Sequence, residues 1–324
     1  MTSMPAISYS LIFSPVFSKM KLSKRIEENT MIILMGEQTD EQIISVAAQL
    51  NKMQRQYAIL DGALFPVRDS ISYFPQANEF GLCIDGKTVM LSDISALYWR
   101  NYRQPANPAQ NAIAAKDSAS LLISALNELG DKAKNSTVAV QFHQEKPRQL
   151  AVVAKLGVQI PPTYVGNNAD AVSAFYQQHS EVIFKPVTGG DYARLLTAEH
   201  LSGQHLAHSL SQSPVTLQRY IRGTNIRSYV IGDAVFSAEI RSEHTDFRTD
   251  GDIALTVIEL PEHVKEQALQ IKTALGLAWS GIDWRRDEQG QYYFLEANPS
   301  PMFANFERYT GLPVAQHLAQ LLAA

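Results

Sequence analysis

The sequence predicts an α/β protein with lobes of mixed α+β type, and three observations support this fold class. The chain has 324 residues, which is more than one ordinary hydrophobic core accommodates. Its first compact stretch has the pattern strand, helix, strand, which is typical of a parallel sheet. Further along, short β-like runs alternate with amphipathic segments, and an apolar content of 45% with a charged content of 19% is typical of globular proteins.

The charge balance and the cysteine content exclude several classes of protein. A net charge of -4 is not that of a broadly basic nucleic-acid binder. Cys83 is the only cysteine, so neither an internal disulfide nor a cysteine-based metal cluster can form. No apolar run approaches the roughly 18 residues that cross a bilayer. We therefore expect a cytoplasmic protein with neither nucleic acid nor a membrane as its partner.

Residues 1–30 have the pattern of an N-terminal extension rather than of a folded element. Their apolar residues at 11–13 come before Lys21 and Lys24, which is the reverse of the order in a secretory signal. We interpret this stretch as a loose arm, with an amphipathic docking element as the alternative. The compact part of the chain is predicted to start near Met31.

Residues 31–112 are predicted to form a small α/β domain. An apolar run at 31–35, helical spacing after Asp40 and a second apolar run at 57–60 form its parallel opening. Short β-like runs then come close together at 71–74, 80–84, 88–91 and 96–99. Amphipathic spacing follows, and we place a helical connection at 113–145.

Residues 81–88 match the phosphate-loop pattern G-x-x-x-x-G-K-T letter for letter. A true phosphate loop lies between a strand and a helix, so that backbone N–H groups face the phosphates. Here the next residues, Val89 to Leu91, are strand-like, and Asp85-Gly86 between two β runs is a strong hairpin signal. We predict a β-hairpin at 81–88 and expect any ATP site to lie elsewhere.

A second predicted hairpin, with its loop at 287–290, gathers acidic residues on one face. If Arg286 faces Gln291 across this loop, then Asp283 faces Phe294. The two-residue period of a strand then puts three residues on the face of Asp283, namely Phe294, Glu296 and Asn298. The opposite face is apolar and carries Trp284, Tyr293, Leu295 and Ala297.

The acidic face of this hairpin has the composition of a magnesium site. Asp283 and Glu296 become diagonal neighbours within about 8 Å, and two carboxylates this close repel each other unless a cation lies between them. Oxygen ligands of this kind suit Mg²⁺. The alternative is a solvated hairpin whose carboxylates pair with Arg285 or Arg286.

The same hairpin resembles the magnesium-binding end of the ATP-grasp superfamily. The resemblance runs from G-I-D-W at 281–284 to F-L-E-A-N-P-S-P at 294–301. It is strongest to the branch of ribosomal-protein glutamate ligases and microviridin-type (graspetide) peptide ligases. The resemblance implies an ATP-grasp fold preceded by a small α/β domain. It also implies that Asp283, Glu296 and Asn298 bind two Mg²⁺ ions, with Mn²⁺ as an alternative, against ATP.

Ordered motifs upstream extend this resemblance over residues 146–324. K-x-x-Q-L at 146–150 resembles the segment whose lysine reaches ATP, which implies that role for Lys146. V-I-F-K-P at 182–186 resembles the strand whose lysine, here Lys185, contacts the phosphates. A carboxylate partner for Lys185 is the structural alternative. The glycine loop that follows in the family corresponds to Gly189 and Gly190.

A third group of motifs resembles the hinge between the two ATP-grasp lobes. In this hinge the adenine edge is met by backbone groups, and the matching positions are Gln218, Arg219, Tyr220 and Ile221. N-I-R-S-Y-V-I-G-D at 225–233 resembles D-I-R-V-Y-V-I-G-D, and the match implies that Arg227 contacts the transferring phosphate. We expect lobes at about 146–216 and 217–324.

Two arginines are candidates for binding the substrate. The segments around Arg241 and Arg248 resemble the I-x-S and D-W-R motifs of graspetide ligases, which implies contact with a substrate carboxylate or acyl phosphate. Surface salt bridges are the alternative for both. The chain departs from that branch at Phe247, which replaces tryptophan, and at 300–303, which lack the expected glycine.

The resemblance implies an ATP-dependent carboxylate–amine ligase, or an ester-forming one, that acts on a peptide or amino acid through an acyl phosphate. Arg227, Arg241 and Arg248 are its implied catalytic residues. No histidine falls in a matched motif. The alternatives are a small-molecule ligase of the glutathione-synthetase kind and a nucleotide-binding regulator without activity. A homodimer is left open.

Overall fold

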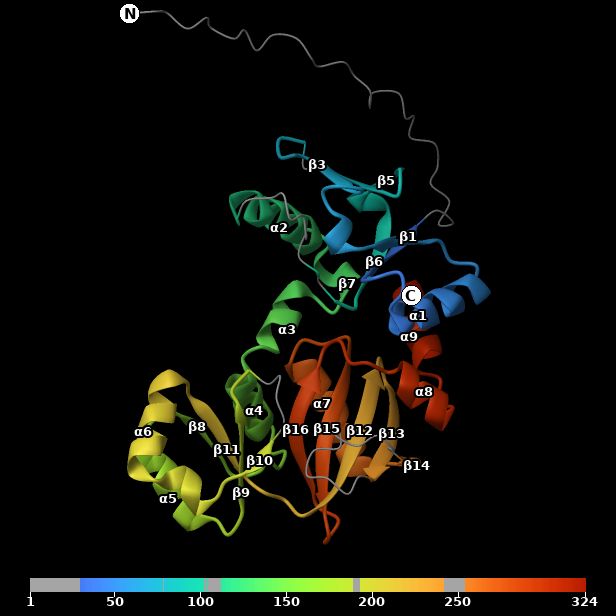
Figure 1. Ribbon diagram of the computed structural model, residues 1–324. Coiled ribbons are helices and arrows are strands. Elements are labelled where there is room, and N and C mark those ends of the chain that lie inside the picture. The colour runs from blue at the N-terminus through green and yellow to red at the C-terminus, as the bar shows by residue number, and fades with distance from the viewer. Residues whose placement is uncertain (1–29, 78, 102, 104–111, 189–192, 242–253) are drawn as a thin grey trace, which may run out of the picture.

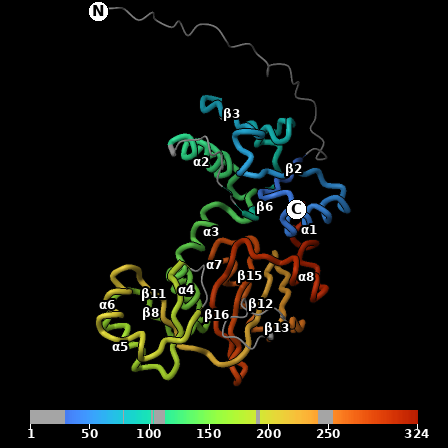
Figure 2. The backbone as a smooth tube through the Cα atoms, viewed as in Figure 1, coloured from blue at the N-terminus to red at the C-terminus, as the bar shows by residue number. Residues whose placement is uncertain are grey.

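The computed structural model describes residues 30–77, 79–101, 103, 112–188, 193–241 and 254–324. The described strands form four sheets, and Figure 1 shows the N-terminal strands above and two further sheets side by side below them. The backbone trace in Figure 2 shows that the chain enters the lower part through the segment between α3 and α4. Among the described residues, no helix has both the length and the apolar character required to cross a membrane.

The N-terminal sheet has the predicted parallel opening. Its strand order is β2-β1-β6-β7, and β1 pairs in parallel with both neighbours. Helix α1 begins after Asp40, whose carboxylate accepts a hydrogen bond from the Gln42 N–H at 2.8 Å, as an N-cap residue does. The elements of this sheet are β1 (Met31–Met35), α1 (Glu41–Lys52), β2 (Tyr57–Leu60), β6 (Ile94–Trp99) and β7 (Ala133–Lys134).

An antiparallel sheet of three strands packs beside this first sheet. It consists of β3 (Ser70–Phe74), β4 (Glu79–Ile84) and β5 (Lys87–Met90). Asp85 and Gly86 have φ values of 50° and 75° in the turn between β4 and β5. The hairpin predicted at 81–88 is confirmed, so these letters do not form a phosphate loop.

Helices connect the N-terminal sheets to the lower half of the molecule. They are α2 (Ala112–Asn127), α3 (Thr137–Phe142) and α4 (Lys146–Lys155). Short 3-10 helices lie at Gly62–Leu64, Leu91–Asp93, Gly130–Lys132 and Ala198–Leu201. The division of the chain at about 112, 145 and 216 remains our proposal.

The next sheet has four antiparallel strands in the order β10-β9-β11-β8. Its helices α5 and α6 contribute Val172, Leu206 and Leu210 to a small core with Leu217 of β11. The elements are β8 (Thr163–Gly166), α5 (Ala169–Gln178), β9 (Val182–Pro186), β10 (Arg194–Leu195), α6 (Gly203–Gln212) and β11 (Val215–Arg219).

The last sheet has five antiparallel strands in the order β14-β13-β12-β15-β16. One of its faces is covered by α4 and α7, where Trp284 and Phe294 are fully buried. The elements are β12 (Gly223–Ile231), β13 (Ala234–Arg241), β14 (Ala254–Ile258), α7 (Glu262–Ala274), β15 (Trp279–Asp287), β16 (Tyr292–Asn298), α8 (Ala304–Thr310) and α9 (Val314–Ala323).

The C-terminal helix α9 packs against the first strand of the N-terminal sheet. Leu318 and Leu322 of α9 pack in one core with Ile32 and Leu34 of β1. In Figure 1 the red α9 accordingly lies beside the blue α1. The five-stranded sheet is therefore held against the N-terminal sheet.

The predicted register of the β15–β16 hairpin was wrong by one residue beside the loop, where Arg286 faces Tyr292, and by two residues at Asp283. Asp283 faces Glu296 directly, and the next pair is Trp284 with Phe294, because Leu295 is an extra residue that forms a β-bulge. The Phe294 N–H donates to the Gln159 carbonyl at 2.8 Å instead of to the ladder. Phe294 consequently lies on the buried face, not on the acidic face where an uninterrupted ladder would put it.

Candidate functional site

One face of the five-stranded sheet carries charged residues in a row across three strands. Arg227 of β12 pairs with Asp283 of β15, which pairs in turn with Glu296 of β16. Asn298 lies two residues beyond Glu296, opposite Gly281. A Cβ on Gly281 would lie only 2.8 Å from the Pro301 ring and 3.2 Å from Arg227, so glycine allows this close approach.

Each carboxylate in this row has a cation beside it. Arg227 Nε lies 2.7 Å from Asp283 Oδ1. Lys146, the first residue of α4, forms an ion pair with Glu296. Among the described residues, the ion pairs of these acids are thus with Arg227 and Lys146 rather than with Arg285 or Arg286, the alternative considered from the sequence; Arg286 binds Glu239 at 2.8 Å.

The electrostatic environment holds Glu296 in its charged form. Burial alone would raise its pKa, but Lys146 and His143, together with Lys185, lower the pKa of the Glu296 carboxyl to about 2. Lys185 comes from β9 of the neighbouring sheet. The structure thus brings the three predicted cations, Lys146, Lys185 and Arg227, to the acidic pair from three separate elements.

A buried glutamine holds the backbone between two of the predicted metal ligands. Gln149 donates to the Ala297 carbonyl and accepts from the Ala297 N–H, both at 2.9 Å, and it is 3% exposed. Ala297 lies between Glu296 and Asn298. The K-x-x-Q-L motif contains this glutamine, but its role could not be predicted from the sequence because its partner is 148 residues away.

Two further polar residues at this strand end were also missed. His143 has a ring nitrogen 3.0 Å from the Ala297 carbonyl, and burial followed by the charge of Lys146 lowers the pKa of its imidazole. Asn135, 1% exposed, donates to the carbonyls of Trp279 and Pro299 at 2.9 and 2.8 Å. Neither residue lies in a motif, so only the tertiary structure reveals them.

The segment after the hairpin is fixed by the N-terminal sheet. Asn298 Oδ1 accepts a hydrogen bond from the Ser300 N–H at 2.8 Å, and the Ser300 hydroxyl donates to the Arg100 carbonyl. Arg100 in turn pairs with Asp40 at 3.0 Å. Residues 300–303, where the sequence departs from the graspetide branch, therefore meet the N-terminal sheet at the rim of the acidic face.

The predicted hinge links β11 in one sheet to β12 in the next. Gln218 is 1% exposed and donates to Thr163 Oγ1 at 3.0 Å. The N–H groups of Arg219 and Tyr220 bond to Pro162 and Glu181 at 2.9 Å each. Within the described part of the chain, the Ile221 N–H has no backbone partner.

Some predicted site residues cannot be placed with the others. Gly189, Gly190 and Arg248 lie outside the described residues. Arg241 ends β13, and only its backbone is described. Their predicted roles remain proposals.

The donor set on the acidic face fits a magnesium ion. Two carboxylates on facing strands and a nearby amide provide oxygen ligands, which Mg²⁺ prefers and usually supplements with phosphate oxygens and water. Within the described ranges, no group of three or more histidine, cysteine, aspartate or glutamate side chains is arranged to hold a metal ion by itself. Binding here would therefore depend on a ligand that supplies the missing oxygens.

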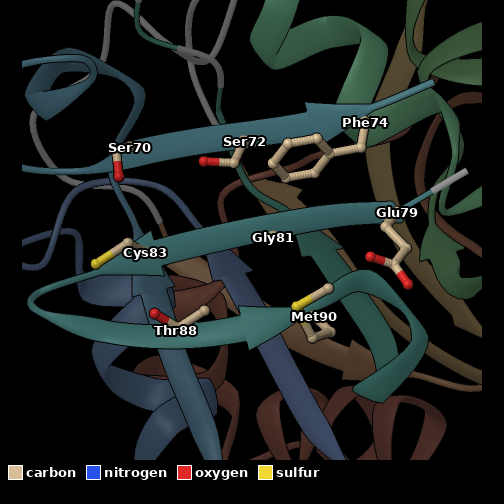
Figure 3. A pocket seen from close by; sticks show the side chains of 8 residues that line it. All are labelled: Ser70, Ser72, Phe74, Glu79, Gly81, Cys83, Thr88 and Met90. Carbon is tan, nitrogen blue, oxygen red and sulfur yellow. The ribbon is translucent and has the colours of Figure 1, made fainter. Parts of the chain in front are cut away.

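A separate hollow of about 310 Å³ lies on the outer face of β3, β4 and β5. Figure 3 shows Cys83 and Glu79 near its opposite ends, with Gly81 between them. The residues that line this hollow include Glu79 but no lysine or arginine, and they belong to a different sheet from Asp283. We do not assign it to the same site.

Comparison with known proteins agrees with this geometry. A family model described as "RimK-like ATP-grasp domain" matches residues 143–322, more than half of the chain. The ribosomal protein bS6--L-glutamate ligase of Escherichia fergusonii is 26% identical over 275 residues, covering 82% of this chain and 88% of that protein.

Solved structures with similar folds include two peptide-bound ligases. The ATP-grasp ligase PsnB, complexed with a variant of its minimal precursor, Mg and ADP, is 27% identical with a TM-score of 0.79, covering 91% of this chain and 98% of PsnB. Macrocyclase MdnC from Microcystis aeruginosa, bound with precursor peptide MdnA, has a TM-score of 0.80 at 22% identity, covering 91% of this chain and 99% of MdnC. The similarity to MdnC bears on the fold alone.

Proposed function

Because this chain belongs to the RimK-like ATP-grasp family, we propose that it is an ATP-dependent ligase that joins a substrate carboxylate to an amine, or to a hydroxyl. The substrate is a peptide or an amino acid. The observation that carries the proposal is the row of Arg227, Asp283 and Glu296 on neighbouring strands, with Lys146 against Glu296.

The acidic row has the chemistry needed to hold Mg-ATP. Asp283, Glu296 and Asn298 are the residues that would hold Mg²⁺, which neutralises phosphate charge when bound. Lys146, Lys185 and Arg227 surround the same carboxylates, so the site offers cations to phosphate oxygens from several directions. Gly189 and Gly190 follow Lys185 and are proposed to approach the phosphates through their N–H groups.

The nucleotide base lies at the hinge in this proposal. Gln218, Arg219, Tyr220 and Ile221 join the two sheets, and backbone groups there meet the adenine edge. The hinge and the acidic row flank the same sheet face, because Arg285 beside the hinge and Asp283 are two residues apart on β15. A nucleotide of extended shape can therefore span both.

The reaction has two steps, formation of an acyl phosphate and its attack by the amine or hydroxyl. A carboxylate oxygen of the substrate attacks the γ-phosphorus, the bond from that phosphorus to the bridging oxygen breaks, and ADP leaves with the electron pair. The amine or hydroxyl then attacks the acyl carbon, phosphate leaves, and the attacking atom loses its proton. Because phosphoryl transfer requires mainly positioning and charge neutralisation, the cations of the site supply most of what is needed.

Arg241 and Arg248 are proposed to bind the substrate carboxylate or the acyl phosphate. Both follow from the resemblance of their segments to peptide-ligase motifs, and a guanidinium binds such groups through two hydrogen bonds. The relatives support a peptide-related substrate, since one is a glutamate ligase for a ribosomal protein and another, PsnB, is complexed with a variant of its minimal precursor. They do not favour the small-molecule ligase or the inactive regulator.

The test is ligation with labelled substrate. Purified protein is incubated with Mg-ATP and a set of amino acids and peptides whose carboxylates carry ¹⁸O. The proposal predicts ADP, phosphate that contains one ¹⁸O atom, and a product whose mass shows loss of water. ADP formation without ¹⁸O in the phosphate would contradict the acyl phosphate. The Glu296→Ala variant is expected to fold and to release no ADP.

A further inference from the structure

Arg285 is a buried cation on the face of the sheet that carries the acidic row. It is 8% exposed, and burial lowers the pKa of its guanidinium. Across the ranges that the structure describes, no carboxylate forms an ion pair with it. Burying a guanidinium costs solvation free energy. The groups that accept its hydrogen bonds therefore indicate its role in the structure.

Within the described part of the chain, the three hydrogen bonds of Arg285 go to the hinge or to the strand that follows it. Its Nε donates to the Ile221 carbonyl at 2.8 Å, and its Nη2 donates to the Tyr220 hydroxyl at 3.1 Å. Its Nη1 donates to Asn225 Oδ1 at 2.9 Å. The guanidinium carbon also lies 5.4 Å from the centre of the Tyr220 ring, within the range of a cation–π contact.

These contacts hold the connection between two sheets. Tyr220 and Ile221 follow β11 of the four-stranded sheet and precede β12 of the five-stranded sheet, whereas Arg285 belongs to β15. Arg285 fixes the Tyr220 side chain on one side of the Ile221 N–H and the Ile221 carbonyl on the other. That N–H, which has no backbone partner in the described chain, is thus held between two fixed points.

The same residue is close to the proposed metal end. Arg285 follows Asp283 by two residues on one strand, so their Cα atoms lie about 7 Å apart on the same face. Arg285 therefore links the hinge to the strand that carries a predicted metal ligand.

We propose that Arg285 is a positioning residue that locks the inter-lobe hinge and thereby determines how tightly and how selectively the base of ATP is bound. This inference rests on the proposed function, because it assumes that the nucleotide base lies at the hinge. Arg285 itself lies between the two matched segments of the hairpin, 281–284 and 294–301. Asn225, one of the three acceptors, stands where the resemblance has aspartate, so the guanidinium is held by neutral oxygens.

The geometry requires a planar group with several donors. A lysine at 285 keeps the charge but offers one ammonium, which cannot reach acceptors on both sides of the hinge at once. Arg285→Lys therefore keeps the positive charge while removing the set of hydrogen bonds that holds both sides of the hinge. Arg222 is a matched control, because it is a hinge arginine whose side chain is exposed and pairs only with Glu181, at 2.8 Å, in the described residues.

The test is calorimetric binding of Mg-ATP and Mg-GTP to the full-length protein and to Arg285→Lys, Arg285→Met and Arg222→Gln. Loss of charged hydrogen bonds at the hinge is expected to weaken Mg-ATP binding by about tenfold or more in both Arg285 variants. Mg-GTP binding should change much less, so the preference for ATP over GTP falls. Arg222→Gln should keep the wild-type preference.

The alternative outcomes are distinguishable. An unchanged ATP preference in Arg285→Lys, with only a lower melting temperature, would show a merely structural residue and overturn the inference while the proposed function stands. Failure of the wild-type protein to bind Mg-ATP would instead overturn the proposed function. If neither Arg285 variant folds, Asn225→Ala removes a single acceptor; it must still lower the ATP preference, and an unchanged preference overturns the inference.

Discussion

At the scale of single residues, the site depends on charges supplied by separate elements. Glu296 comes from β16, Lys146 from α4 and Lys185 from β9, and together with His143 the two lysines keep the pKa of the Glu296 carboxyl at about 2 despite burial. An acid held in this way is ready to bind a cation at neutral pH. Its ionisation also contributes to stability.

The stability of the protein in acid should reveal this contribution. Because the folded pKa of Glu296 lies near 2, below its usual value of 4.5, the unfolded chain takes up the proton first as the pH falls. The contribution is therefore complete above about pH 4.5 and is lost towards pH 2. In Glu296→Gln, the melting temperature should fall less steeply than in the wild type between about pH 5 and pH 3. Parallel curves would contradict the depressed pKa.

Gln149 allows a second test at this scale. Gln149→Met has a similar volume but loses both hydrogen bonds to Ala297, which should lower the free energy of unfolding by about 2 kcal/mol. Since Ala297 lies between two predicted metal ligands, the magnesium concentration for half-maximal activity should rise by about 10- to 100-fold. Gln144→Met, a nearby exposed change, is the control. An unchanged magnesium requirement would show that Gln149 only stabilises the fold.

At the scale of elements, features that depend on local sequence patterns could be predicted, whereas contacts between residues far apart in the sequence could not. The parallel opening at 31–60 and the hairpin at 81–88 follow from spacing and turn residues, and both are observed. The β15–β16 register could not be predicted, because the bulge at Leu295 depends on the Gln159 carbonyl, more than a hundred residues away. Gln149, His143 and Asn135 escaped sequence reasoning for the same reason.

The hairpin at 81–88 leads to a prediction about a misleading motif. Lys87 begins β5 and is exposed, whereas the lysine of a phosphate loop faces the nucleotide. Lys87→Ala should therefore leave the KM for ATP unchanged within about twofold, as expected of a surface substitution. Lys146→Ala, measured beside it, should raise that KM strongly. A comparable rise in Lys87→Ala would contradict the assignment of this segment.

At the scale of the whole molecule, three parts meet around the acidic row. The five-stranded sheet supplies Asp283 and Glu296, the four-stranded sheet supplies Lys185, and the N-terminal sheet holds residues 300–303 through Arg100. The buried contacts of α9 with β1 hold two of these parts together. Ligand bound between the parts should therefore stabilise the whole protein, by about 2.7 kcal/mol at a concentration of 100 times Kd.

The most direct test of the central claim is calorimetric binding of ADP with and without magnesium, in the wild type and in Asp283→Asn. If the acidic row is the metal end of a nucleotide site, the wild type binds ADP much more tightly with magnesium than without it. The variant should bind ADP similarly in both conditions. Magnesium-independent binding by the wild type, or an intact magnesium effect in Asp283→Asn, would contradict the account.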